Sequence, residues 1–221
     1  MAPLTQSELQ QQLQTGIQQL GLELSPERLA ALQLYLELLE KWNRSFNLSG
    51  IKDLQQMVSL HILDSLAISP YLHGDTILDV GSGAGLPGIP LAIFNPDKEF
   101  ILLDSNGKKI RFLFQVKLAL KLNNVSIENK RVEHYDCHRQ IDIVISRAFS
   151  SLARLVELCS RAAGNRGLLL AMKGTYPQQE IAELPEGVEV TQAVQLQVPG
   201  IEASRYLIEI PLGNPEPEAR N

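Results

Sequence analysis

The sequence predicts an α/β fold with a mostly parallel, seven-stranded sheet, a C-terminal antiparallel hairpin and an N-terminal helical extension. From Thr76 onward, short apolar segments typical of buried strands alternate with segments of helical periodicity. The last two β segments follow each other without a helix, so we expect them to pair as a hairpin through Pro199-Gly200. The first 70 residues instead carry apolar side chains at helical spacing.

Helix-start signals delimit the elements of the extension, residues 1–70. Ser25 is expected to cap a helix that has Pro26 and Glu27 in its first turn. An apolar stripe then continues to about Trp42. Asp53 is expected to cap a further helix, which ends at Pro70.

The α/β domain is expected to span residues 71–212. Strands are predicted at 76–80, 99–104, 125–129, 141–146, 166–172, 187–197 and 204–210. Helices are predicted at 87–94, 107–122, 151–163 and 177–184. The acidic, proline-containing tail, residues 213–221, is expected to be disordered.

Composition restricts the class of protein. With 221 residues, 44% hydrophobic and 20% charged, the chain can bury a substantial core. No apolar run approaches the roughly 20 residues of a membrane helix, and the first residues lack the pattern of a secretion signal. Cys137 and Cys159 make neither a disulfide framework nor a metal site. We therefore expect a monomeric cytoplasmic protein without a structural metal or a membrane partner.

Charge is distributed unevenly along the chain. The net charge is −5, yet the stretch from Gly107 to Arg131 carries +6, which leaves −11 for the rest. Such asymmetry indicates an anionic partner for one face, although a solvated helix face would give the same pattern. Lys108, Lys109 and Arg111 are the candidate RNA-binding residues of this stretch.

A glycine-rich turn between two strands is the strongest functional signal. The strand that contains Asp79 runs into Gly81, Gly83, Gly85 and Gly88, and the next strand ends at Asp104. Glycines let the backbone turn sharply and approach a ligand, and an acid at the end of the second strand can accept hydrogen bonds from a ribose. The pattern predicts half of a nucleoside-binding site.

The register of these glycines disfavours a dinucleotide. Beginning at Gly83, a G-x-G-x-x-G match is preceded by Gly81 and Ser82 rather than by a strand; beginning at Gly81, the third glycine position falls on Leu86. S-adenosylmethionine fits better, because it has no phosphate to bind. Asp79 would hold the turn or the methionine ammonium, Gly81 would lie against the methionyl part, and Asp104 would bind the ribose.

Five segments of the chain resemble the bacterial 16S rRNA guanine-N7 methyltransferase family, also known as glucose-inhibited division protein B. They are HILDS (61–65), DVGSGAGLPGIP (79–90), LLDSNGKKIRFL (102–113), RVE (131–133) and ISRAF (145–149). The resemblance covers most of the chain. It implies a Rossmann-like class I methyltransferase fold that uses S-adenosylmethionine to methylate a guanine in the decoding-region hairpin of 16S rRNA, on the naked RNA or in the small subunit. It also implies cofactor contacts at Gly81, Leu86, Val132, Glu133 and Arg147.

The residues agree with this chemistry. Guanine N7 carries no proton, so its methylation needs no general base, and the chain lacks the Pro-Cys dyad of cytosine-C5 enzymes and the Asn/Asp-Pro-Pro-aromatic turn of enzymes that modify exocyclic amines.

Arg147, just beyond a strand, is the candidate for substrate positioning; a pairing with a structural carboxylate is the alternative. His61 and Asp64 share one helix face, as a structural or a catalytic pair. Phe149 could stack on a base or lie in the core, and Lys173 could contact RNA.

Three other functions stay open from the residues. A small-molecule or protein methyltransferase would use the same cofactor, but it gives no reason for the +6 stretch. A nicotinamide-dependent oxidoreductase fits the glycine register poorly. A non-catalytic RNA-binding module would have no need of the intact glycine turn and Asp104.

Overall fold

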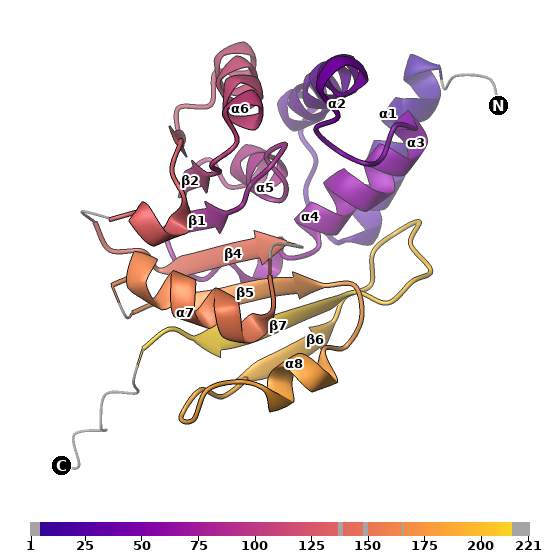
Figure 1. Ribbon diagram of the computed structural model, residues 1–221. Helices are drawn as coiled ribbons and strands as arrows, with labels where there is room; N and C mark the ends of the chain where they lie inside the picture. Colours follow the sequence, from indigo (N-terminus) through magenta and orange to yellow (C-terminus); the bar gives the residue numbers. More distant parts are fainter. Residues whose placement is uncertain (1–4, 137–138, 148–149, 165, 214–221) are drawn as a thin grey trace.

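The computed structural model describes residues 5–136, 139–147, 150–164 and 166–213. Its centre is a seven-stranded sheet with the order β3-β2-β1-β4-β5-β7-β6 (Figure 1). The strands are β1 (Thr76–Val80), β2 (Glu99–Leu103), β3 (Val125–Glu128), β4 (Ile143–Arg147), β5 (Leu168–Lys173), β6 (Gln192–Gln195) and β7 (Tyr206–Pro211). The first five pair in parallel, whereas β7 runs antiparallel to both β5 and β6. The predicted α/β fold with a C-terminal hairpin is confirmed.

Helices cover both faces of the sheet. The α-helices in the described residues of the α/β part are α5 (Gly88–Phe94), α6 (Gly107–Leu120), α7 (Leu152–Ala162) and α8 (Gln178–Ala182). Alternate residues along each strand point to opposite faces, so Ile77 packs with α5 and α6 whereas Leu78 packs with α7. The carboxyl ends of the parallel strands, where such folds bind ligands, lie at one edge of this sandwich.

The N-terminal helices complete one of these two cores. They are α1 (Gln6–Gln19), α2 (Pro26–Phe46), α3 (Leu54–Met57), the π-helix η1 (Val58–Leu63) and α4 (Asp64–Leu66). Ser25 and Asp53 cap α2 and α3 as predicted, each accepting a hydrogen bond from a backbone N–H of the first turn. The apolar side chains of the extension belong to the same buried cluster as those of α5, α6 and one sheet face. The extension and the sheet therefore share one core.

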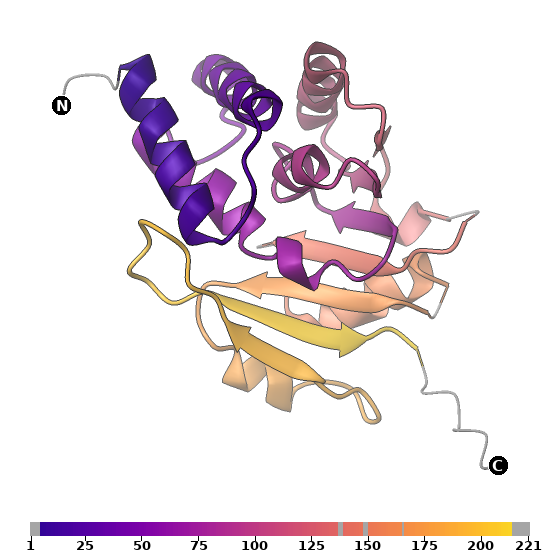
Figure 2. The ribbon, with the colours of Figure 1, turned by 180° about the vertical axis from the view of Figure 1, so that it is seen from behind.

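The hairpin is shorter than the sequence pattern suggests. A strand was expected over 187–197, but β6 includes only Gln192–Gln195. The N–H of Val188 donates to the carbonyl of Pro185 in a turn, so this part of the chain does not join the ladder. The loop between β6 and β7 lies beside the N-terminal helices (Figure 1, Figure 2). Residues 214–221 of the expected disordered tail lie outside the described residues.

Candidate functional site

The glycine turn follows β1 at the carboxyl edge of the sheet. Gly81, Gly83 and Gly85 have φ angles of 71°, 60° and 87°, in the left-handed region that side chains with a Cβ rarely adopt. The N–H groups of Gly81 and Ser82 both donate to the carbonyl of Leu103, at 2.9 and 3.1 Å. The turn is thereby fixed to the end of β2, with its backbone free of side chains at the glycine positions.

Asp79 lies fully buried beneath this turn. Its Oδ2 accepts a hydrogen bond from the N–H of Gly88 at 2.9 Å, which fixes the start of α5. Its Oδ1, and the Oγ of neighbouring Ser82, are buried and have no partner among the described residues. Burial raises the pKa of Asp79 to about 7, since the charged form loses its hydration. Two unpartnered polar atoms next to Gly81 fit a ligand that brings hydrogen-bond donors or a positive charge.

Asp79→Asn should change the pH dependence of stability. A raised pKa means that the folded state binds a proton that the unfolded state releases, so this carboxyl lowers stability as pH rises from its ordinary pKa of 3.8 to about 7. The loss is at most about 1.4 kcal/mol per pH unit. Asn should keep the acceptor for Gly88 and remove this slope. The unfolding free energy of both proteins, measured by urea unfolding from pH 4 to 8, checks this expectation. If the two free energies changed in parallel with pH, the expectation would be contradicted.

Asp104 lies at the end of β2 and faces the turn. Its Oδ2 accepts from the N–H of Gly83 at 2.9 Å, and its Oδ1 accepts from the N–H of Asn106 at 2.8 Å. The ammonium of Lys109 lies 3.5 Å from the same carboxylate. The structure therefore brings Asp104 to the turn as expected, and it places Lys109 against this carboxylate rather than on the open face of α6.

A tyrosine from the N-terminal extension also holds the turn. The hydroxyl of Tyr35 donates to the carbonyl of Ala84 at 2.7 Å, and its fully buried ring packs against Phe112. Burial raises the pKa of Tyr35, so the phenol stays a donor at all ordinary pH values. No pattern in the sequence marks this contact, because α2 and the turn meet only in the folded chain.

Tyr35→Phe should loosen the turn without emptying the core. The Ala84 carbonyl would lose its buried partner, at a cost of about 1–3 kcal/mol in unfolding free energy. Without this hydrogen bond the turn is more mobile, and binding must order it again. We therefore expect affinity for S-adenosylmethionine to fall about fivefold. Titration calorimetry measures it, with Tyr71→Phe as the matched control at a half-buried tyrosine. If the variant shows the expected loss of unfolding free energy but binds S-adenosylmethionine as the wild type does, Tyr35 acts on the core alone.

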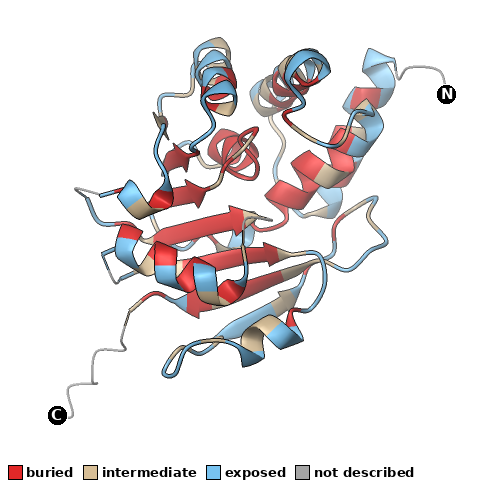
Figure 3. Ribbon diagram, viewed as in Figure 1, coloured by how far each residue is buried: buried red, intermediate tan, exposed pale blue. Residues whose placement is uncertain are grey.

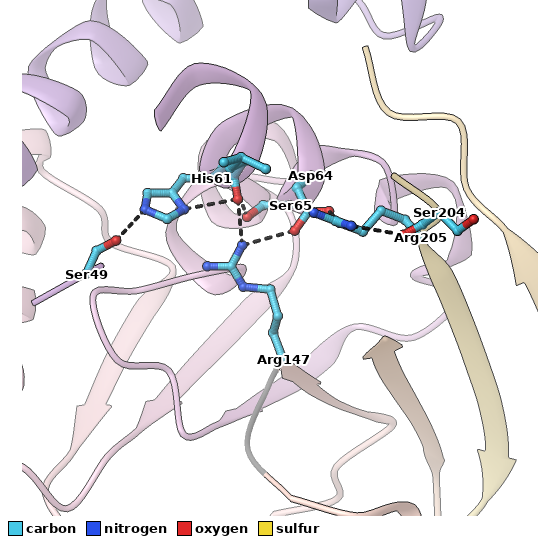
Figure 4. Close-up of polar contacts among 8 residues, drawn as sticks. Ser49, His61, Asp64, Ser65, Arg147, Ser204 and Arg205 are labelled. Carbon is cyan, nitrogen blue, oxygen red and sulfur yellow. Dashed lines mark hydrogen bonds and ion pairs between the residues drawn. The ribbon is translucent and has the colours of Figure 1, made fainter. Parts of the chain in front are cut away.

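Arg147, at the end of β4, is anchored by the extension. Its Nη1 donates to the carbonyl of Leu60 and to Oδ2 of Asp64, each at 3.0 Å (Figure 4). The other carboxylate oxygen of Asp64 accepts from Nε of Arg205 at 3.2 Å. The Asp64 side chain is only 6% exposed. One buried carboxylate therefore holds two guanidinium groups that come from distant parts of the sequence.

The π-helix η1 places these groups. It was not predicted, although π-helical turns are frequent at functional sites. His61 of η1 makes a hydrogen bond of 2.6 Å through Nε2 to Oγ of Ser49, while Asp64 bonds the two arginines (Figure 4). Burial, aided by the charge of Arg147, lowers the pKa of His61 to about 4, so the imidazole is neutral at pH 7. The two side chains thus take different partners instead of forming the pair considered from the sequence.

A cavity of about 500 Å³ opens beside Arg147. It is lined by Ile51, Leu60, His61, Asp64, Arg147, Met172, Lys173, Gly174, Leu196, Arg205 and Tyr206. Sequence reasoning missed Ile51, Leu196, Arg205 and Tyr206, which reach the cavity from a loop and from the hairpin. Neither motif nor spacing indicated that the hairpin returns to the site.

The remaining predicted residues have mixed placements. Leu86 and Val132 are buried, and Glu133, in η3 (Val132–His134), pairs with Arg154 at 3.4 Å. The ammonium of Lys173 donates to the Glu180 carboxylate and to a backbone carbonyl, so it is already paired with acceptors of its own chain. Lys108 and Arg111 are exposed on α6. Cys137 and Phe149 lie outside the described residues.

The described residues form neither a metal site nor a membrane-spanning helix. Among the described residues, His, Cys, Asp and Glu side chains form no group that could hold a metal ion. Within the same ranges, none of the helices combines the length and the apolar character needed to cross a bilayer.

Comparisons with known proteins show what this chain is similar to. The model of the family described as rRNA small subunit methyltransferase G matches residues 28–208. Ribosomal RNA small subunit methyltransferase G of Marinomonas sp. (strain MWYL1) is 50% identical over 89% of this chain and 94% of the relative; that of Nitrosococcus oceani is 50% identical over 90% and 92%. A solved S-adenosylmethionine-dependent methyltransferase of Aquifex aeolicus superposes with a TM-score of 0.51 at 16% identity, over 70% of this chain and 92% of its own. The last match shows the fold alone.

Proposed function

Since this chain belongs to the rRNA small subunit methyltransferase G family, we propose that it methylates N7 of one guanine in the decoding-region hairpin of 16S rRNA. The chain is an S-adenosylmethionine-dependent methyltransferase that acts on small-subunit rRNA, and its Rossmann-like class I fold is that of such enzymes. The atom, the nucleotide and the roles of individual residues are the proposal. The observation that carries it is the anchored Arg147, which lies at a cavity and ends β4; this strand pairs with β1, the strand that leads into the glycine turn.

The glycine turn would hold the cofactor, which supplies a methyl group on a positively charged sulfonium. Oδ1 of Asp79 and Oγ of Ser82, both unpartnered among the described residues, fit the ammonium of the methionyl part. Asp104 would accept hydrogen bonds from the ribose through lone pairs that Gly83 and Asn106 leave free. The buried side chains of Leu86 and Val132 would flank the adenine, with Glu133 at its rim.

The cavity beside Arg147 would hold the guanine. Nη1 of Arg147 is taken by Leu60 and Asp64, so its Nε and Nη2, without partners among the described residues, could donate to the guanine acceptor edge or a phosphate. N7 carries a lone pair and no proton, so the residues need only orient the base and exclude water. His61, neutral and bonded to Ser49, would support the wall of the cavity rather than move a proton.

Residues outside the cavity would bind the rest of the RNA. Lys108 and Arg111 are exposed on α6 and can contact phosphates. Lys173 would contribute only if RNA displaced Glu180 from its ammonium. We take the active unit to be one chain in the cytoplasm, because one chain supplies both the cofactor half and the base half of the site.

A methyl-transfer assay with purified subunits and purified rRNA tests this proposal. The enzyme is incubated with labelled S-adenosylmethionine and, in separate reactions, with small subunits, naked 16S rRNA or large-subunit RNA from cells that lack the modification. We expect label in the 16S rRNA at up to one methyl per molecule and none in large-subunit RNA. Label in large-subunit RNA, or none in any small-subunit substrate, would contradict the proposal.

A further inference from the structure

Helix α6 exposes two large apolar side chains on its outer face. Phe114 is 53% exposed and Leu118 is 76% exposed. They lie four residues apart, so they are neighbours on one side of the helix. The opposite side packs Phe112 and Val116 into the core, and the outward side of the helix is exposed (Figure 3). Because both side chains are exposed, packing in the core does not explain why these two positions are apolar.

This apolar pair is surrounded by positive charge. Arg111 and Lys121 precede and follow it at helical spacing, and Lys108 stands on the first turn. Between Gly107 and Lys121 there are five basic residues and no acid. Lys108, Lys117 and Lys121 have no acidic partner within the described ranges, and Nε of Arg111 donates only to a carbonyl of its own helix.

We propose that Phe114, Leu118 and the basic residues around them, Lys108, Arg111 and Lys121, form a stacking platform for an unpaired nucleotide of the RNA substrate. An aromatic ring can stack on any exposed base, while the surrounding cations bind the phosphates. Leu118 extends the apolar surface under the base or its ribose. The inference rests on the proposed function and adds to it a second contact with RNA, away from the reacting guanine.

The position of α6 supports an RNA strand that continues from the active site. The helix begins three residues after Asp104, and Lys109 on its first turn contacts that carboxylate. Phe114 and Leu118 therefore lie about 10 and 16 Å along the helix axis from its start at Gly107. An RNA strand that passes the start of α6 can cover these distances within a few nucleotides.

Charge favours RNA over a protein partner for this face. Because every charged residue of this helix is basic, it repels a basic protein surface and attracts phosphates. An acidic protein could also bind it, and the experiment below separates the two by using RNA alone as a probe.

The test compares Phe114→Ala and Leu118→Ala with Leu34→Ala, which removes a 37% exposed leucine from α2. The probe is a fluorescein-labelled single-stranded RNA, with a duplex of equal length beside it. Phe114→Ala should weaken single-strand binding about tenfold and change duplex binding little. Leu34→Ala should bind as the wild type does. Lys108→Gln with Arg111→Gln should instead reduce the salt dependence of both probes.

Two further readouts separate stacking from a structural effect. Phe114→Trp should retain affinity, and its added fluorescence should be quenched by the single strand, whereas Leu34→Trp should show no quenching. In methyl transfer, Phe114→Ala should raise the KM for unmodified small subunits about tenfold, with kcat and affinity for S-adenosylmethionine unchanged.

The outcomes distinguish this inference from the proposed function. Wild-type RNA affinity and KM in Phe114→Ala would overturn the platform and leave the function intact. A raised KM for subunits with unchanged affinity for the RNA probe would also overturn it, by indicating a protein contact. If Phe114→Ala loses affinity for the RNA probe but the wild type methylates no small-subunit RNA, the platform stands and the proposed function fails.

Discussion

Gly81→Val is expected to abolish measurable binding of S-adenosylmethionine, with a loss of at least about 100-fold, while the protein stays folded. Gly81 has a φ of 71°, at which a β-branched side chain is strained by about 1–2 kcal/mol. A small domain with about 5–15 kcal/mol of stability tolerates this cost. The valine side chain would also occupy the backbone surface against which the methionyl part should lie. Titration calorimetry measures the affinity, and thermal unfolding measures the stability.

Gly21→Val is the matched control for this strain. Gly21 has the same φ of 71°, and a Cβ there would meet nothing within 4 Å. Both variants should therefore lose similar stability, and only Gly81→Val should lose the cofactor. Normal affinity for S-adenosylmethionine in Gly81→Val would contradict the assignment of this turn as the cofactor site.

Asp64→Ala should lower kcat by about 100-fold, because misplacing a positioning group by an ångström can cost this much. The variant removes the carboxylate that orients Arg147 and also holds Arg205. Asp64→Asn keeps one acceptor and should recover part of the rate. Rates at saturating substrate, measured beside the affinity for S-adenosylmethionine, check this expectation.

A double-mutant cycle separates positioning from stability. Leaving two arginines without their buried partner also destabilises the fold, by about 3–5 kcal/mol, so the assay must run well below the melting transition. If Asp64 acts through Arg147, adding Asp64→Ala to Arg147→Ala should lower kcat little further. Additive losses would show that Asp64 acts independently of Arg147.

The parts of this protein that were predictable from sequence depend on local patterns. The apolar segments of β1 and β2, the caps Ser25 and Asp53, and the hairpin turn each follow from neighbouring residues. The glycine turn was predictable for the same reason: φ angles such as those of Gly81, Gly83 and Gly85 strongly favour glycine, and the spacing of the glycines is visible in the chain. Asp104 came with it, because parallel strands end at one edge.

The joint arrangement of Arg147, Asp64 and Arg205 was not predictable, although the first two were named as candidates, because it is assembled from distant segments. Arg205 and Asp64 are 141 residues apart in sequence, and Arg147 and Asp64 are 83 apart. Only the packing of the N-terminal helices on the sheet, and the return of the hairpin to them, brings the three together. The π-helix that carries His61 has no local signature, since one residue of slip in a helix is decided by tertiary contacts.

The position of the methyl group on the RNA tests the central claim most directly. Small subunits that lack the modification are methylated in vitro, and their 16S rRNA is then cleaved at N7-methylguanine and mapped by primer extension. We predict one new cleavage, at a guanine of the decoding-region hairpin, that requires both enzyme and S-adenosylmethionine and is absent with Gly81→Val. Incorporated methyl label without any N7-dependent cleavage, or cleavage outside that hairpin, would contradict the account.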